Sequence, residues 1–334
     1  SAYEAPVPFN SSGRPLFDAL EATSRCIASH NNKSYEVRVG TLSVPADTKT
    51  PWRLSDPLTD HWLQSIDEKS WKRFGDIAKI RVGIKTTADN VFLGEDWSTR
   101  APAVESSLLL PLITQRNITP WRISGRLDTK VLYPYDLSSE RRRVLNIEDW
   151  PGASAYLRRH EGQLRGRKYV IEGGREWYEI WVPQRPALWA KPKIVFPDIS
   201  ESPRFALDTS GAVVNGNCYW ISLADVQEES HAYLILAVAN SSFGLRYYDE
   251  VCGNRLYSGK RRWITQYVKR LPLPRPDTAE ARSLVAFARR LSTSMSITPD
   301  LLMQLDEKVE AAFDASQARS APGEDREEFS TTLF

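Results

Sequence analysis

The sequence predicts an α+β protein: a mixed, mostly antiparallel β-sheet domain with peripheral helices and a C-terminal helical segment. Two observations carry this prediction. Short apolar segments of strand length, separated by Pro, Gly and Asn, fill the middle of the chain. From residue 224 to about residue 315, apolar residues instead recur at helical spacing. A β-rich middle followed by helices is therefore expected.

The first 70 residues mix Pro, Ser and Asn with short periodic stretches. We expect an amphipathic helix over Leu16–Ala28 and a strand over Ser34–Val39. Neither element assigns residues 1–70 to a domain, so we treat them as a separate N-terminal segment.

A change of pattern begins at Trp71. Phe74–Val82 alternates apolar and polar side chains, which predicts a strand that ends in a tight loop at Gly83. A second strand is expected over Asn90–Leu93. The segments Leu108–Ile113 and Lys130–Tyr135 contain Pro, which suits edge or terminal strand positions.

The central region combines one basic helix with three strands. Ala153–Arg167 has helix-compatible residues with arginines around most of its surface. Strands are expected over Lys193–Pro197, Arg204–Asp208 and Cys218–Ser222, and turn residues such as Asn215-Gly216 separate them.

Helical spacing dominates the rest of the chain. An apolar stripe predicts a helix over Ala224–Tyr248 that ends or bends at Asn240-Ser-Ser. Thr278–Ser292 and Pro299–Ala315 follow a Pro-rich linker, and Thr298 is the expected N-cap of the second. Residues 317–334 are polar, acidic and aperiodic, which predicts a disordered tail.

Bulk composition is that of an ordinary globular chain. The 334 residues are 41% hydrophobic and 26% charged. Three widely spaced cysteines form no C-x-x-C pair, which indicates reduced thiols in a cytoplasmic protein. No apolar run approaches the roughly 20 residues of a membrane span. The chain starts without Met, so we interpret it as a fragment of a larger protein.

Positive charge is concentrated in one segment. Residues 251–276 carry seven basic and no acidic side chains, whereas 277–334 carry six basic and eleven acidic ones. Such a cluster, with Tyr257, Trp263 and Tyr267 among its members, is typical of a phosphate-backbone contact. A solvated surface loop with long aliphatic stems is an equally good interpretation.

Several catalytic motifs are missing from the sequence. It has no G-x-G turn, no adjacent Pro pair, no H-E-x-x-H and no P-loop. Pro276-Asp277 followed by Asp306-Glu307-Lys308 loosely fits a metal-dependent nuclease. We interpret that match as a coincidence, because Asp306–Lys308 falls within a predicted helix rather than on converging strands.

Nine phrases occur in a fixed order between Trp71 and Arg275. They are Gly83–Phe92, Leu110–Ile118, Leu132–Tyr135, Tyr156–Arg165, Trp177-Tyr178, Lys191–Ile199, Asn217–Ile221, Tyr233–Ser241 and Leu271–Pro274. Together they resemble the TaqI-like C-terminal specificity domain of bacterial type II restriction-modification adenine-specific DNA methyltransferases. One loop departs from the family, which usually has Thr-Gly-x-Asn where this chain has Thr86-Thr87-Ala88-Asp89.

The resemblance implies the domain organisation. Residues 71–275 would be the DNA target-recognition domain, followed by C-terminal helices over 276–316. Residues 1–70 would be the trailing edge of a missing catalytic domain, in the same polypeptide or a separate subunit. That partner would bind S-adenosyl-L-methionine and methylate a flipped adenine, and this chain would hold no cofactor or metal.

The resemblance also implies contacts to double-stranded DNA. Base-edge readout needs amide or cationic side chains, and the turns offer Lys85, Thr86, Thr87, Asn90, Gln115, Arg116, Asn117, Asn215, Asn217, Asn254 and Arg255. The first candidates for phosphate contacts are Lys260, Arg261 and Arg262, and the second are Arg158, Arg159, Arg165 and Arg167.

Two other functions remain open. The chain could be the recognition part of a fused restriction nuclease-methyltransferase. It could also be a protein-interaction domain whose basic surface binds an acidic partner. An acidic-protein binder would show no preference among DNA sequences.

Overall fold

The computed structural model describes residues 2–3, 14–15, 18–19, 21, 26–37, 40–43, 53–55, 57–252, 256, 259–294 and 296–318. It divides into two compact units, Ser1–Glu68 and Lys69–Phe334.

The first unit contains a small sheet in the strand order β1-β4-β3-β2. Its strands are β1 (Ala2–Tyr3), β2 (Arg14–Pro15), β3 (Cys26–His30) and β4 (Lys33–Val37). Asn31 and Asn32 close the β3–β4 hairpin with φ values of 50° and 59°, a left-handed pair that Asn tolerates well. A separate hairpin, β5 (Thr41–Ser43) with β6 (Arg53–Ser55), precedes helix α2 (Pro57–Lys69).

Strand β4 confirms the strand expected near Ser34. The helix expected over Leu16–Ala28 is wrong at its end, because Cys26–Ala28 lie in β3 and pair with β4. Much of that predicted helix lies outside the described residues.

A six-stranded sheet forms the centre of the second unit, in the order β11-β12-β16-β14-β18-β8. The strands are β8 (Ile80–Val82), β11 (Ile118–Thr119), β12 (Trp121–Ile123), β14 (Lys193–Pro197), β16 (Ala206–Asp208) and β18 (Cys218–Ser222). Every pairing is antiparallel except β12 with β16. All five residues of β14 are buried, so this strand runs through the core.

A four-stranded sheet, whose strands alternate along the chain with those of the first, has the order β17-β10-β13-β9. It consists of β9 (Leu93–Gly94), β10 (Leu109–Ile113), β13 (Lys130–Leu132) and β17 (Val213–Val214). Short strand pairs join β7 (Lys72–Arg73) to β20 (Pro272–Leu273) and β15 (Ile199–Ser200) to β19 (Arg261–Arg262). Both sheets contribute to one hydrophobic core, from Ile84 on the β8 side to Leu112 and Val131 in the smaller sheet and Trp220 in β18.

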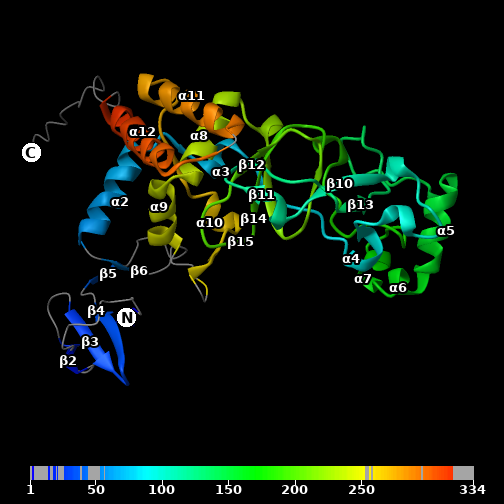
Figure 1. Cartoon of the computed structure of the whole chain (residues 1–334), viewed down its shortest axis with the longest axis horizontal. Helices are drawn as coiled ribbons and strands as arrows, with labels where there is room; N and C mark the ends of the chain where they lie inside the picture. Colours follow the sequence, from blue (N-terminus) through cyan, green and yellow to red (C-terminus); the bar gives the residue numbers. More distant parts are fainter. Residues whose placement is uncertain are drawn as a thin grey trace, which may run out of the picture. The chain divides into compact units, whose positions relative to one another are not determined.

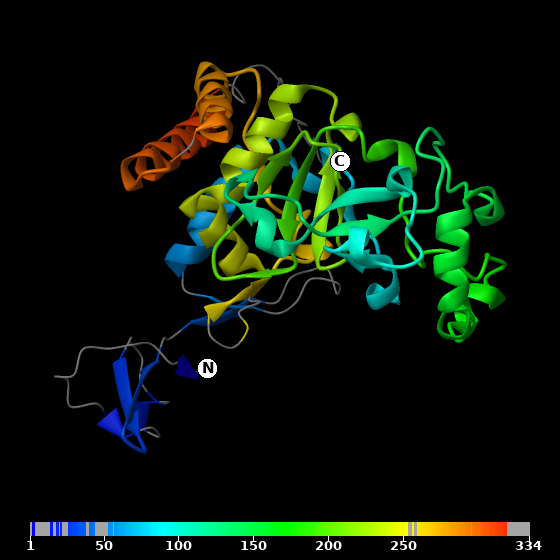
Figure 2. The same ribbon diagram turned by 45° about the vertical axis from the view of Figure 1, so that its right-hand side comes forward.

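Helices gather at two ends of this unit. Figures 1 and 2 place α5 (Pro151–Arg159), α6 (Glu161–Arg165) and α7 (Lys168–Glu172) opposite α11 (Ala279–Thr293) and α12 (Pro299–Ala318). Between α8 (Glu229–Asn240) and α9 (Ser242–Cys252), Ser241 leaves the helical conformation. The break expected at Asn240-Ser-Ser is therefore confirmed. The basic helix expected over Ala153–Arg167 is instead two helices that meet at His160.

Two predicted strands are wrong. Phe74–Ile77 forms the short helix α3, in which the Asp76 carboxylate accepts a hydrogen bond from the Arg73 backbone N–H at 2.7 Å. Only Ile80–Val82 pairs as a strand. Asp89–Phe92 forms the helical turn α4 rather than a strand. Alternation over so few residues does not separate a strand from a capped helical turn.

The predicted α+β class is confirmed by mixed helices and mostly antiparallel sheets. Within the described part of the chain, no helix is both long and apolar enough to cross a membrane. The three cysteines are unpaired, as predicted.

Candidate functional site

Three adjoining hollows lie on the second unit, and we call them together the groove. The amide hollow, about 670 Å³, is lined by 84–90, Gln163 and 215–217. The central hollow, about 370 Å³, shares Asn217 with it and adds 114–117, Arg126 and Asp128. The basic hollow, about 600 Å³, shares Gln115 and Arg116 with the central one and is also lined by 199–202, Arg204 and Lys260. Turns far apart in the sequence therefore converge on one surface.

Two backbone segments meet at the amide hollow with no side chain between them. Ile84 N–H donates to the Val214 carbonyl at 2.8 Å, and Gly83 N–H donates to the Cys218 carbonyl at 2.9 Å. A Cβ on Gly83 would lie 2.0 Å from the Asn215 carbonyl oxygen, and one on Gly216 would lie 2.5 Å from the Ile84 carbonyl oxygen. Glycine at both positions permits this close approach.

The loop after Gly83 is fastened from two sides. The Arg167 guanidinium donates to the Thr86 carbonyl at 2.9 Å and to the Trp177 carbonyl at 2.8 Å. The Thr86 hydroxyl donates to the Asp89 carboxylate and accepts from the Ala88 N–H. Thr87 occupies the left-handed region with φ of 58°, at the position where the family usually has glycine.

Four amide side chains border the amide hollow. Asn90 and Gln163 are exposed and exchange two hydrogen bonds, of 3.3 Å and 2.9 Å. Asn217 is also exposed, and the side-chain oxygen Oδ1 of Asn215 accepts from the Asn217 backbone N–H at 3.1 Å. Among the described residues, none accepts a hydrogen bond from the side-chain NH₂ of Asn215 or Asn217.

Three exposed cations of the groove have no ion-pair or side-chain hydrogen-bond partner within the described ranges. They are Lys85, Arg116 and Lys260. Arg204 is half-buried in the basic hollow: its guanidinium makes long contacts of 3.4 Å to the Gln115 and Ile118 carbonyls, and no described residue accepts a hydrogen bond from its buried Nε. These side chains are available to an anionic ligand.

Two predicted base contacts are occupied with internal hydrogen bonds. Thr86 is only 1% exposed and holds the loop as described above. The Asn117 carbonyl oxygen accepts from both the backbone N–H and the hydroxyl of Thr114 at 2.9 Å, and its NH₂ donates to the Arg126 carbonyl. Both side chains shape the groove, and their contact with bases stays a prediction.

Most of the predicted phosphate contacts already have partners. Arg261 forms a bidentate pair with Asp249 at 2.6 Å and 2.7 Å. Arg262 lies 3.5 Å from Asp198. Arg167 is 6% exposed, and burial lowers the pKa of its guanidinium. Arg167 therefore has a structural role, and its contact with phosphate stays a prediction.

Acidic neighbours also lie beside the arginines of α5 and α6. Arg158 pairs with Glu148, and Arg165 pairs with Glu161. Arg159 donates to the Ala101 carbonyl at 2.7 Å. None of these three side chains lines the groove hollows, in contrast to Lys260.

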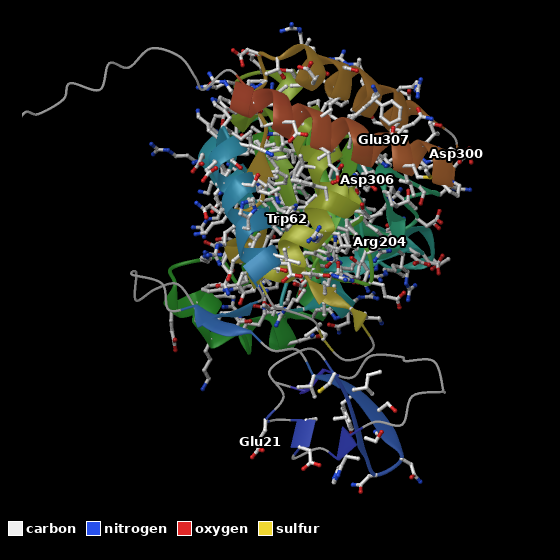
Figure 3. All side chains as sticks on the ribbon, turned by 90° about the vertical axis from the view of Figure 1, so that its left-hand side faces the viewer. Glu21, Trp62, Arg204, Asp300, Asp306 and Glu307 are labelled. Carbon is white, nitrogen blue, oxygen red and sulfur yellow. The ribbon has the colours of Figure 1, made fainter. Side chains whose placement is uncertain are left out.

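Asn254 and Arg255 lie outside the described residues. The nuclease-like pattern is explained by packing: Asp306, on α12 in Figure 3, accepts hydrogen bonds from the backbone N–H and hydroxyl of Ser242 at the start of α9. No group of three metal-ligating side chains occurs among the described residues.

A family model for the TaqI-like C-terminal specificity domain matches residues 110–273. Residues 110–273 therefore form a TaqI-like specificity domain. This segment supplies the basic hollow, all of the central hollow except Glu95, and Gln163 and the 215–217 wall of the amide hollow.

Relatives of the specificity domain are type II methyltransferases. M.BanIII of Aneurinibacillus aneurinilyticus is 36% identical over 279 residues, which cover 83% of this chain and 48% of that protein. M.PaeR7I of Pseudomonas aeruginosa is 25% identical over 59% of this chain and 32% of its own length. The chain thus spans half or less of the length of these relatives.

A solved structure shares the fold. The Type IIL restriction-modification enzyme MmeI, determined in complex with DNA, superposes with a TM-score of 0.50 at 14% identity. The match covers 76% of this chain and 34% of MmeI.

Three groove residues of the specificity domain were not predicted from the sequence: Arg126, Gln163 and Arg204. Gln163 lies within the arginine-rich segment Ala153–Arg167, where the arginines predicted a charged surface and the single amide gave no separate signal. Arg126 and Arg204 lie outside the predicted turns but line the central and basic hollows. No local signal marks them, because only the fold brings them beside Arg116.

Proposed function

We propose that this chain supplies target recognition for a type II DNA methyltransferase that modifies the N6 amino group of adenine. The observation that carries the proposal is the groove itself, in which segments far apart in the sequence combine exposed amides with cations that have no acidic partner among the described residues. Amides and cations are the side chains that read base edges and bind phosphates in duplex DNA. The specificity-domain family and the methyltransferase relatives support the same function.

Methyl transfer itself is assigned to a partner catalytic domain. The sequence has no glycine-rich G-x-G turn and no Pro-Pro pair, so its residues do not fit S-adenosyl-L-methionine or a flipped adenine. We propose that the cofactor binds that partner domain and that this chain positions it on the DNA.

The basic hollow is proposed as the phosphate clamp. Arg116, Arg204 and Lys260 face a single carboxylate there, that of Glu201. Of the three first candidates for phosphate contacts, we propose Lys260 as the leading one. Arg261 pairs with Asp249, and Arg262 pairs with Asp198.

Lys260→Gln tests this clamp. Each cation that neutralises a phosphate contributes about one to the slope of log affinity against log salt. We expect Lys260→Gln to weaken binding to all duplex sequences alike and to flatten that slope by about one. Fluorescence anisotropy of the full chain with labelled duplexes at several salt concentrations measures both.

The matched control is Lys79→Gln. Lys79 is also exposed but precedes β8, at the opposite end of that strand from the Gly83 loop, and it lines none of the three hollows. An unchanged slope in Lys260→Gln, or an equal change in the control, would contradict the clamp. If the chain instead binds an acidic protein, Lys260→Gln should weaken binding to that protein, and the wild-type chain should bind all DNA sequences with the same affinity.

A further inference from the structure

We propose that Asn90 and Gln163 act together as one reader of an adenine base in the target duplex. This inference rests on the proposed DNA-reading function and assigns a base to one part of the groove. Both side chains are exposed and line the amide hollow, although they come from α4 and α6.

The paired amides keep the hydrogen-bonding capacity that a base edge needs. Asn90 donates to the Gln163 carbonyl at 3.3 Å, and Gln163 donates to the Asn90 carbonyl at 2.9 Å. Each NH₂ group has two hydrogens and each carbonyl has two lone pairs. After pairing, each amide therefore retains one donor and one acceptor for a ligand.

The pair is held in place before any DNA binds. Arg167, directly after α6, donates to the Thr86 carbonyl in the loop that leads into α4. The Tyr156 hydroxyl of α5 donates to the Val91 carbonyl within α4 at 2.9 Å. Leu164, next to Gln163, is completely buried. These contacts fix the backbone on both sides, and the two mutual hydrogen bonds limit the rotation of the side chains, which lowers the entropy lost on binding.

Charge separates this hollow from the rest of the groove. The amide hollow contains one cation, Lys85, and one anion, Asp89, whereas the basic hollow contains three cations and one anion. A phosphate would be attracted more strongly to the basic hollow than to the amide hollow, where one carboxylate offsets the single cation. The amide hollow therefore suits an uncharged base edge.

Adenine is the base that matches this chemistry. Its major-groove edge presents the N7 acceptor beside the N6 amino donor, and an Asn or Gln amide satisfies both at once. Guanine presents two acceptors, which Arg or Lys satisfies better. We assign guanine to neither amide.

A modified base tests the assignment without altering the protein. The preferred duplex of the full chain is first selected from a randomised pool. Each adenine in it is then replaced, one at a time, by 7-deazaadenine, which lacks only the N7 acceptor. We expect one position to lose at least about 5-fold in affinity for the wild-type chain. In Gln163→Ala, we expect the same replacement to have no effect.

Gln163→Glu gives the second arm. Glutamate can accept a hydrogen bond from the amino group of cytosine but cannot donate to N7 of adenine. We expect the preference at that single position to move from A·T towards C·G, by about 5- to 150-fold in relative affinity. Gln304→Glu on α12 makes the same substitution at an exposed residue outside the groove hollows and should leave every base preference unchanged.

The outcomes separate this inference from the function beneath it. A wild-type chain that selects no preferred duplex contradicts the proposed function, and the adenine reader with it. A chain that selects a duplex but tolerates 7-deazaadenine everywhere contradicts the reader alone. Sensitivity to 7-deazaadenine that persists in Gln163→Ala also contradicts the reader, as does an unchanged preference in Gln163→Glu.

Discussion

Gly83→Ala should lower the free energy of unfolding by about 1–3 kcal/mol, the usual cost of forcing extra atoms into a packed region. The added Cβ would lie 2.0 Å from the Asn215 carbonyl oxygen and 2.4 Å from that of Val214. Both are backbone atoms, so neither can rotate away. The loop at Ile84 and the turn at Asn215 would have to separate, and their shared wall of the amide hollow would open.

DNA binding should fall together with stability in this variant. Urea unfolding and duplex binding of the full chain measure the two effects. Gly162→Ala is the control, because a Cβ added there would have no atom within 4 Å and α6 is helical at this position. Alanine should stabilise that helix by about 0.5–1 kcal/mol. A Gly83→Ala chain as stable as wild type would show that the two segments are not held together as described.

Lys193→Met should destabilise the chain by about 3–5 kcal/mol, because it leaves a buried charge without its partner. Lys193 and Asp208 are 0% and 2% exposed, and their charged atoms lie 2.7 Å apart across β14 and β16. Burial lowers the pKa of Lys193, and the neighbouring Asp208 charge opposes that shift. The Lys193 ammonium also donates to the Trp189 carbonyl at 3.0 Å.

The double variant Lys193→Met with Asp208→Asn should recover much of this loss. Asparagine keeps an acceptor for the Ser210 N–H but carries no charge that needs compensation. Arg126→Met is the exposed counterpart: its pair with Asp128 has side chains 91% and 60% exposed, and exposed pairs contribute at most about 1 kcal/mol. Similar losses in Lys193→Met and Arg126→Met, measured by urea unfolding, would refute the buried-pair account.

Elements with several turns or a long apolar run were predictable from the sequence. The strands at Lys193 and Cys218 and the paired helices around Ser241 follow from local periodicity, and the structure has them. Phe74–Ile77 and Asp89–Phe92 were misassigned, because contacts from far along the chain decide them. Gly75 N–H donates to the Lys269 carbonyl, and Arg167 fastens the loop before Asp89.

The candidate site was also predictable only where local sequence determines it. Turn residues with amides or free cations, such as Asn90, Arg116 and Lys260, do share one groove, although their contact with DNA stays a prediction. Residues 251–276 contain no acidic side chain, which predicted free arginines, but Arg261 and Arg262 have acidic partners outside this segment. Their counter-charges come from Asp249, 12 residues from Arg261, and from Asp198, 64 residues from Arg262. Charge balance within a window of sequence cannot detect such pairs.

Selection of duplexes from a randomised pool by the full chain tests the central claim most directly. If the groove reads DNA sequence, the bound fraction should converge within a few rounds on one short motif. Non-specific duplex in excess should not erase that motif, because specific affinity exceeds non-specific affinity by at least about a thousandfold. A bound fraction that keeps the composition of the starting pool would contradict the proposed recognition function.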